Sequence, residues 1–209
     1  MLDEAGLQCC KIVASNSLDE YLIRDLMMQE AKIDTFGVGE RLITAKSAPV
    51  FGGVYKLAAV EDEQGNIIPK IKISENTAKI TNPHYKKLYR FYDNESGKAL
   101  ADELCVYDET IDSTKPHTIF DPDAIWKTKT LTDYTARELH VTVFKNGELV
   151  YKQPSLYEIR IYCAEQLETL WDEVKRFENP HTYYVDLSKK LWDIKNALLE
   201  KSKDGKDLK

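Results

Sequence analysis

The chain has 209 residues, 43% hydrophobic and 31% charged, which is typical of a globular protein that forms one large domain or two small ones. Its net charge of −6 argues against nucleic acid or an anionic membrane as the main partner, because phosphate contacts require clustered lysine and arginine. Neither a signal-peptide pattern nor a run of about 18 apolar residues occurs, so we expect a cytoplasmic protein without membrane contact.

The first segment reads as a strand, a helix and a second strand. Residues 11–14 form a short apolar run, and residues 33–36 form another. Between them, Ser17 and Glu20 fit a capping box that would begin a helix ending near residue 30. We therefore predict a βαβ unit with parallel strands, which is followed at once by a glycine-containing loop, Gly37-Val38-Gly39.

The middle of the chain reads as a series of antiparallel hairpins. In each, two runs rich in strand-forming residues flank a polar turn. The strongest signal is Asn146-Gly147, because both residues tolerate a positive φ. The predicted strand pairs are residues 54–60 with 67–73, 87–92 with 99–107, and 139–144 with 148–152.

Two helices are predicted at the C-terminal end. Ser155 and Glu158 form a capping box that opens a helix running to about residue 177. Asp186 or Ser188 caps the last helix. Aromatic residues fall among leucines in these helices, so we expect them in the core. They are Tyr157, Tyr162, Trp171 and Trp192.

The four cysteines and four histidines are not arranged as metal sites. No cysteine pair has the C-x-x-C spacing that lets two thiolates reach one metal ion, so we expect reduced and mostly buried thiols. No histidine has a partner in Glu-x-x-His or His-x-x-x-His spacing, so we expect surface or structural roles. These residues are Cys9, Cys10, Cys105, Cys163, His84, His117, His140 and His181.

The ends of the two predicted parallel strands carry the candidate site. Gly37 and Gly39 can form a tight turn, or they can let backbone N–H groups approach a phosphate. Ser15 and Asn16 follow the neighbouring strand at the end where α/β sheets bind ligands, although Ser17 can be explained by the helix cap alone. A hydroxyl- and amide-bearing turn beside an anion-binding loop suits a sugar phosphate.

Several ordered blocks of the sequence resemble the nicotinate phosphoribosyltransferases. They span most of the chain. The blocks are residues 12–20, 36–39, 52–57, 71–76 and 79–83, with Asn179-Pro180-His181 and Tyr183 near the C-terminal end. A nicotinamide- or quinolinate-specific transferase fits residues 52–57 (Gly-Gly-Val-Tyr-Lys-Leu) less well.

The resemblance implies an α/β fold class: part of an irregular type II phosphoribosyltransferase barrel, then a strand-rich segment and two C-terminal helices. The implied divisions are residues 1–57 with the phosphate loop, 58–154, and 155–209. It further implies the formation of nicotinate mononucleotide from nicotinate and phosphoribosyl pyrophosphate, in NAD biosynthesis. ATP hydrolysis through a phosphohistidine, Mg²⁺ and a homodimer with shared active sites belong to the same expectation.

The resemblance also assigns roles to individual residues. Ser15 and Asn16 would lie near the ribose, while Gly37, Gly39 and the backbone of Glu40 would hold the 5-phosphate. Many relatives have threonine at the position of Glu40. Its acidic side chain must therefore point away from the phosphate or be neutralised, for which the adjacent arginine is a candidate.

The family's other site residues are expected N-terminal to Met1. These are a Ser-Gly-Asp-Leu segment, nicotinate-stacking aromatics and arginines, and the phosphorylated histidine. We therefore expect no catalytic residue and no metal ligand in this chain, and an inactive isolated polypeptide. The alternative is a catalytically inactive module derived from that family, which binds a sugar phosphate or serves in assembly.

Overall fold

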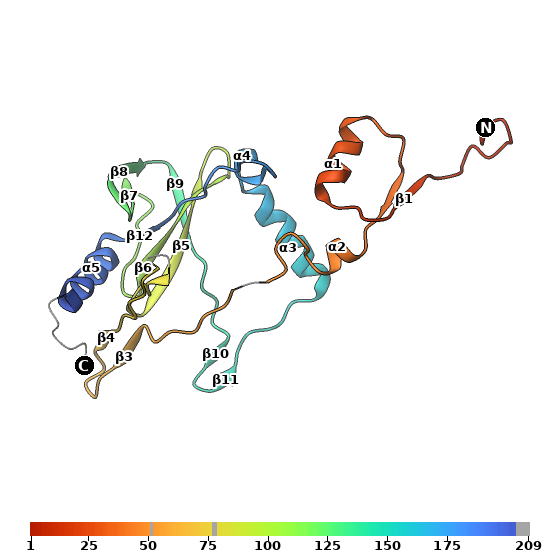
Figure 1. The fold of residues 1–209 in the computed structure, drawn as a ribbon. Helices are drawn as coiled ribbons and strands as arrows, with labels where there is room; N and C mark the ends of the chain where they lie inside the picture. Colours follow the sequence, from red (N-terminus) through yellow and green to blue (C-terminus); the bar gives the residue numbers. More distant parts are fainter. Residues whose placement is uncertain (51, 77–78, 204–209) are drawn as a thin grey trace. The chain divides into compact units, whose positions relative to one another are not determined.

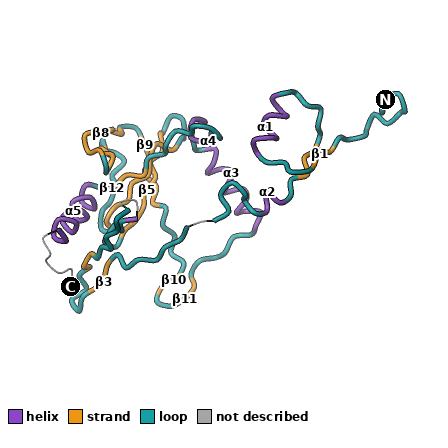
Figure 2. The backbone as a smooth tube through the Cα atoms, in the orientation of Figure 1, coloured by secondary structure: helices purple, strands orange, loops and turns teal. Residues whose placement is uncertain are grey.

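The computed structural model describes residues 1–50, 52–76 and 79–203. The chain separates into two compact units, Met1–Tyr55 and Lys56–Lys209, whose elements are labelled in Figure 1. Helices and strands are short in the first unit and are joined by long loops (Figure 2). Across the described ranges, no helix is long and apolar enough to cross a membrane.

The first unit contains the βαβ arrangement that the sequence predicts. Strand β1 (Val13–Ser15) is followed by helix α1 (Glu20–Met28) and strand β2 (Thr35–Gly37), and a short helix α2 (Glu40–Ile43) comes next. The two strands pair in parallel, with Ser15 opposite Gly37. Both strands therefore end at the same edge of the sheet.

The cap of α1 differs from the prediction. Asp19, not Ser17, is the N-cap residue, and its carboxylate accepts a hydrogen bond of 2.9 Å from the backbone N–H of Leu22. Asn16 and Ser17 both have positive φ, 86° and 53°, so the chain turns sharply directly after β1. This turn moves Ser17 out of the cap position, and the helix begins at Glu20.

The first unit has almost no core of its own. Among its described residues, Leu18 is the only one that is buried. Apolar side chains on β1 and on α1 remain exposed, including Val13, Leu22 and Met28. A βαβ unit with bare helix and strand faces needs further partners to bury them.

The second unit is built on a four-stranded sheet with the strand order β12-β6-β5-β9. Strands β5 and β6 form the antiparallel hairpin expected there, and β9 pairs antiparallel to β5. Strand β12 lies parallel to β6, a pairing that the sequence did not indicate. The strands are β5 (Lys86–Asp93), β6 (Ala99–Val106), β9 (Tyr134–Glu138) and β12 (Val185–Leu187).

Three antiparallel hairpins accompany this sheet. The pairs β3–β4 and β10–β11 confirm the predicted hairpins with shorter strands, and β7–β8 is an additional hairpin. Asn146 and Gly147 at the tip of β10–β11 have φ of 52° and 80°, as their sequence predicts. The strands are β3 (Ala59–Glu61), β4 (Ile67–Pro69), β7 (His117–Asp121), β8 (Ala124–Leu131), β10 (Phe144–Lys145) and β11 (Glu148–Leu149).

The core of the second unit lies against the four-stranded sheet. One cluster is centred on Phe91 and Tyr134, whose rings meet edge to face at 5.5 Å between centroids. A second cluster joins Val106, Leu187 and Leu191, through which helix α5 (Lys189–Lys203) packs on the sheet. Ser188 caps this helix and accepts a hydrogen bond from the N–H of Leu191. Asp186, the other predicted cap, lies inside β12 instead.

The helical region after residue 154 departs from the prediction in two ways. Its capping box is present, with Ser155 and Glu158 bonded reciprocally, but α3 (Leu156–Glu168) stops early and a separate α4 (Asp172–Lys175) follows. The helix α3 has no buried residue.

Three of the four aromatic residues expected in the core are exposed. The exposed fraction of Tyr157 is 72% and that of Tyr162 is 56%, and Trp171 is exposed as well. Only Trp192 is half-buried, with its indole N–H bonded to the carbonyl of Pro122 at 3.0 Å. The apolar residues of α3 therefore do not belong to the core of the second unit.

The cysteines are free thiols, but they are not mostly buried as expected. Cys105 is buried, whereas Cys9, Cys10 and Cys163 are exposed. Burial and the nearby carboxylate of Glu103 raise the pKa of the Cys105 thiol, so it stays protonated as part of the core.

Candidate functional site

A polar pocket of about 350 Å³ opens beside the carboxyl ends of β1 and β2. It brings together Asn16, Gly37, Gly39 and Glu40, four of the five residues to which the sequence assigned a role. Ser15 stands next to the pocket, paired with Gly37 in the strand register, but does not line it. The remaining lining residues are Ser17, Leu18, Arg41 and Lys46.

The two glycines serve different purposes in this pocket. A Cβ at Gly37 would lie 3.3 Å from the Cβ of Ser15, so a side chain there would push the two strand ends apart. A Cβ at Gly39 would meet no atom within 4 Å, so this backbone is open on the side where a side chain would stand. The first glycine allows the strands to pack closely, and the second leaves the loop accessible.

The loop after β2 presents backbone donors. Gly39 is the N-cap residue of α2 and makes no side-chain capping bond. Within the described ranges, no hydrogen bond is recorded for the backbone N–H of Gly39 or Glu40. Such unsatisfied N–H groups can bind the oxygens of an anion.

Glu40 is not neutralised by the adjacent Arg41, the partner that the sequence suggested. Arg41 forms an ion pair with Asp19 at the start of α1. Glu40 instead lies 3.6 Å from the amine of Lys46, and both of these side chains are exposed. Arg41 is therefore already engaged, and Lys46, which sequence reasoning passed over, is the cation nearest to Glu40.

Asp19 is an ionised carboxylate that organises this corner of the pocket. Its pKa lies below the usual value, first because the backbone N–H of Leu22 donates to it and then because of the charge of Arg41. One carboxylate thus caps α1 and holds the guanidinium at the rim of the pocket. Asp19 lies within the helix-cap segment of the sequence, but the pattern there favours Ser17 and Glu20 as the capping residues.

The histidines lie outside this unit, because residues 1–55 contain none. His117 binds the carboxylate of Glu103 through Nε2 at 2.8 Å, and His140 accepts from the backbone N–H of Leu88 at 3.0 Å. Both are structural contacts, in agreement with the roles expected for them. Over the part of the chain that the structure describes, no group of three or more His, Cys, Asp and Glu side chains could hold a metal ion.

A parallel βαβ unit whose glycine loop borders a polar pocket is the arrangement of an anion-binding α/β protein. Residues 85–195 match the family model described as nicotinate phosphoribosyltransferase C-terminal domain. The chain therefore belongs to the nicotinate phosphoribosyltransferase family. This match lies in the second unit, whereas the pocket lies in the first.

The matches to individual relatives cover nearly all of this chain and so extend into the first unit. The nicotinate phosphoribosyltransferase of Bacillus subtilis (strain 168) is 41% identical over 195 residues, which cover 93% of this chain and 40% of that protein. The enzyme of Dictyostelium discoideum is 34% identical over 206 residues, which cover 95% of this chain and 34% of that protein. The chain thus spans well under half the length of these relatives.

A solved structure shows the same fold. The crystal structure of human nicotinic acid phosphoribosyltransferase superposes with a TM-score of 0.67 at 23% sequence identity. The match covers 94% of this chain and 36% of the human chain. The mixed α/β arrangement is therefore that of the corresponding part of the human protein.

Proposed function

We propose that this chain is the C-terminal portion of a nicotinate phosphoribosyltransferase and supplies the ribose and 5-phosphate part of its active site. The observation that carries this proposal is the pocket at the ends of β1 and β2, in which Asn16 lies with Gly37, Gly39 and Glu40. The family match and the relatives that share this region support the same assignment.

The proposed reaction joins nicotinate to the ribosyl group of phosphoribosyl pyrophosphate. The bond between ribose C1 and pyrophosphate breaks, pyrophosphate leaves, and the nicotinate ring nitrogen bonds to C1 to give nicotinate mononucleotide. In the proposed roles, the backbone N–H groups of Gly39 and Glu40 hold the 5-phosphate, and Ser15 and Asn16 lie at the ribose. A fixed phosphate positions C1 for attack, which lowers the entropic part of the barrier.

The acidic side chain of Glu40 must not oppose the phosphate. In the structure it lies toward Lys46, at 3.6 Å, and it is exposed to solvent, which screens its charge. We propose that the backbone of Glu40 contacts the phosphate while its carboxylate stays with this lysine. Arg41 stays at the rim of the pocket because it pairs with Asp19 and not with Glu40.

ATP hydrolysis and Mg²⁺ are part of the proposed whole-enzyme reaction, but the described residues do not form a site for the metal. No suitable cluster of three ligands occurs among them. No histidine occurs in residues 1–55 that could serve as a phosphohistidine at the pocket. We therefore propose that the metal, ATP and the nicotinate contacts involve parts of the enzyme beyond these residues, and that the isolated chain is inactive.

A homodimer is the proposed assembly. Its physical support is the large amount of exposed apolar surface, which includes Val13 and Met28 in the first unit and Tyr157 in the second. Faces of this kind are covered in complete proteins by other domains or subunits.

The proposed site can be tested by titrating phosphoribosyl pyrophosphate into the ¹⁵N-labelled chain. We expect amide shifts at residues 37–41 and no synthesis of nicotinate mononucleotide. Gly39→Ala places a methyl group on the open side of the loop and should weaken binding by about tenfold or more, the size of a lost charged hydrogen bond. Gly52→Ala is the matched control, because a Cβ at Gly52 also meets no atom within 4 Å.

The outcomes separate the proposal from its alternative. Shifts that spread over the chain without involving residues 37–41, or equal binding by the two variants, would contradict the phosphate site. Detectable product would contradict the inactivity of the isolated chain. Tight binding in the nanomolar range would favour a stand-alone sugar-phosphate-binding module, which the confinement of all pocket residues to positions 16–46 makes physically feasible.

A further inference from the structure

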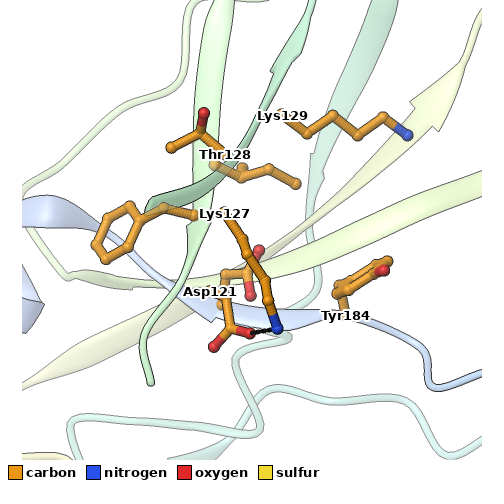
Figure 3. A pocket seen from close by; sticks show the side chains of 8 residues that line it. Asp121, Lys127, Thr128, Lys129 and Tyr184 are labelled. Atoms are coloured by element: carbon orange, nitrogen blue, oxygen red, sulfur yellow. Dashed lines mark ion pairs between the residues drawn. The ribbon is translucent and has the colours of Figure 1, made fainter. Parts of the chain in front are cut away.

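A second cavity, of about 300 Å³, lies in the other unit beside the hairpin β7–β8 and strand β12 (Figure 3). It is independent of the phosphate pocket, since all its residues belong to positions 119–186. Its walls combine apolar and charged groups. The lining residues are Ile119, Phe120, Asp121, Lys127, Thr128, Lys129, Tyr184 and Asp186.

Asp186 is the unusual residue of this cavity. It sits in the middle of β12, and its exposed fraction is only 5%. Within the described parts of the chain, no side chain or backbone group is recorded as a hydrogen-bonding or ion-pairing partner of its carboxyl group. Its carboxyl group borders the cavity instead of being sealed in the core, while burial of most of the side chain still disfavours the charged form.

The neighbouring charges do not compensate Asp186. Figure 3 shows Lys127 reaching to Asp121, with 3.7 Å between the amine and the carboxylate, so this cation is already engaged. The side chain of Lys129 extends away from that pair. Burial, together with the negative charges of Asp121 and Glu103, raises the pKa of Asp186 to about 6.

The rest of the wall is suited to the body of an organic molecule. Ile119 is buried, Phe120 is half-buried, and Figure 3 shows the ring of Tyr184 on the side opposite Asp121. The volume is at the lower limit of known small-molecule pockets. It therefore accommodates a ligand of the size of one aromatic ring with a short substituent.

We propose that this cavity binds a small organic cation, a primary ammonium group carried on an aromatic or apolar body. The ammonium would donate hydrogen bonds to Asp186, and the body would pack against Phe120 and Tyr184. A cation is favoured over an anion because, among the described residues, Asp186 has no cationic partner, whereas Lys127 is paired with Asp121 and Lys129 extends away from that pair. A divalent metal is disfavoured because the cavity has only two carboxyl groups and lacks a third protein ligand.

The probe is benzylamine, with benzyl alcohol as a ligand of similar shape that lacks the charge. Titration of each into the ¹⁵N-labelled chain at about pH 7.5, where Asp186 is ionised, should shift the amides of β8 and β12 with benzylamine. We expect benzyl alcohol to bind at least about tenfold more weakly, because it lacks the ion pair.

Two matched variants test the role of Asp186. Asp186→Asn keeps the shape of the side chain, removes its charge and should weaken benzylamine by about tenfold or more. Asp123→Asn should leave the affinity unchanged, because Asp123 is exposed and does not line this cavity. A circular dichroism melt confirms that each variant is folded. If Asp186→Asn does not fold, Asp186→Ala replaces it, with the same loss expected.

Equal affinity for the two probes, or unchanged benzylamine binding in the folded Asp186→Asn or Asp186→Ala chain, would overturn the proposal. So would amide shifts confined to positions outside 119–131 and 184–187. Failure at this cavity leaves the phosphate pocket untouched, because no residue is shared between the two.

Discussion

Replacing Asp186 by asparagine should stabilise the chain at neutral and alkaline pH. Asp186 lies in β12 with an exposed fraction of 5% and borders the cavity, and its pKa in the folded chain is about 6 against an ordinary value of 3.8. Burial is the main cause, and the charges of Asp121 and Glu103 add to it. The folded state thus prefers the protonated acid.

The sign and the size follow from this pKa difference. A group whose folded pKa is raised contributes stability that is fully present below the unfolded pKa and is lost as the pH rises through the folded pKa. The loss therefore develops between 3.8 and about 6 and is complete above that range. The difference between the two values corresponds to roughly 3 kcal/mol. This figure is an upper bound, because solvent in the cavity beside Asp186 screens its charge.

Urea denaturation of the wild-type and Asp186→Asn chains across this range measures the effect. The gain in free energy of unfolding should be under about 1 kcal/mol near pH 4 and should rise to at most roughly 3 kcal/mol near pH 8. Subtracting the free energies of unfolding of the two chains cancels the contributions of the other titrating groups, because these groups are the same in both chains. Asp123→Asn should show no such rise. A gain that does not depend on pH, or a loss of stability at pH 8, would refute this account of Asp186.

Two further substitutions test the packing of the second unit. Asp102→Ala should destabilise the chain by about 3–5 kcal/mol in urea denaturation, because it leaves Arg90, held at 2.8 and 2.9 Å by two bonds, without its partner; a cost below about 1 kcal/mol would show that solvent replaces the pair. Leu191→Ala should cost about 2–5 kcal/mol in the same assay, because this fully buried side chain joins α5 to the sheet; an unchanged midpoint would show that α5 does not contribute to the cooperative unit.

Elements of both units leave apolar surface exposed. Helix α3 has a correct capping box and an apolar pattern, yet none of its residues is buried. The first unit buries only Leu18 among its described residues. The hydrogen bonds and caps of these elements form locally, while the burial that normally stabilises such elements is missing. This supports the proposal that other parts of a larger enzyme cover these faces.

The sequence alone determined the local structure, because short-range patterns carry that information. The Ser155–Glu158 capping box, the Asn146-Gly147 hairpin and the parallel βαβ unit were all predicted and are present. Most of the candidate pocket also followed from the sequence. Strand ends that are adjacent in a parallel pair must place their following loops side by side, which brings Asn16 to the glycine loop.

Only the tertiary structure decided the rest, because these features depend on residues far apart in the chain. The pairing of β12 with β6 joins segments about 80 residues apart, and it buries Asp186 where the sequence indicated a helix cap. The ion pair of Asp19 with Arg41, which spans 22 residues, likewise joins the start of α1 to a residue that the cap pattern does not include. The sequence did not predict that the aromatic residues of α3 are exposed, because apolar residues in a helix do not show which surface covers them.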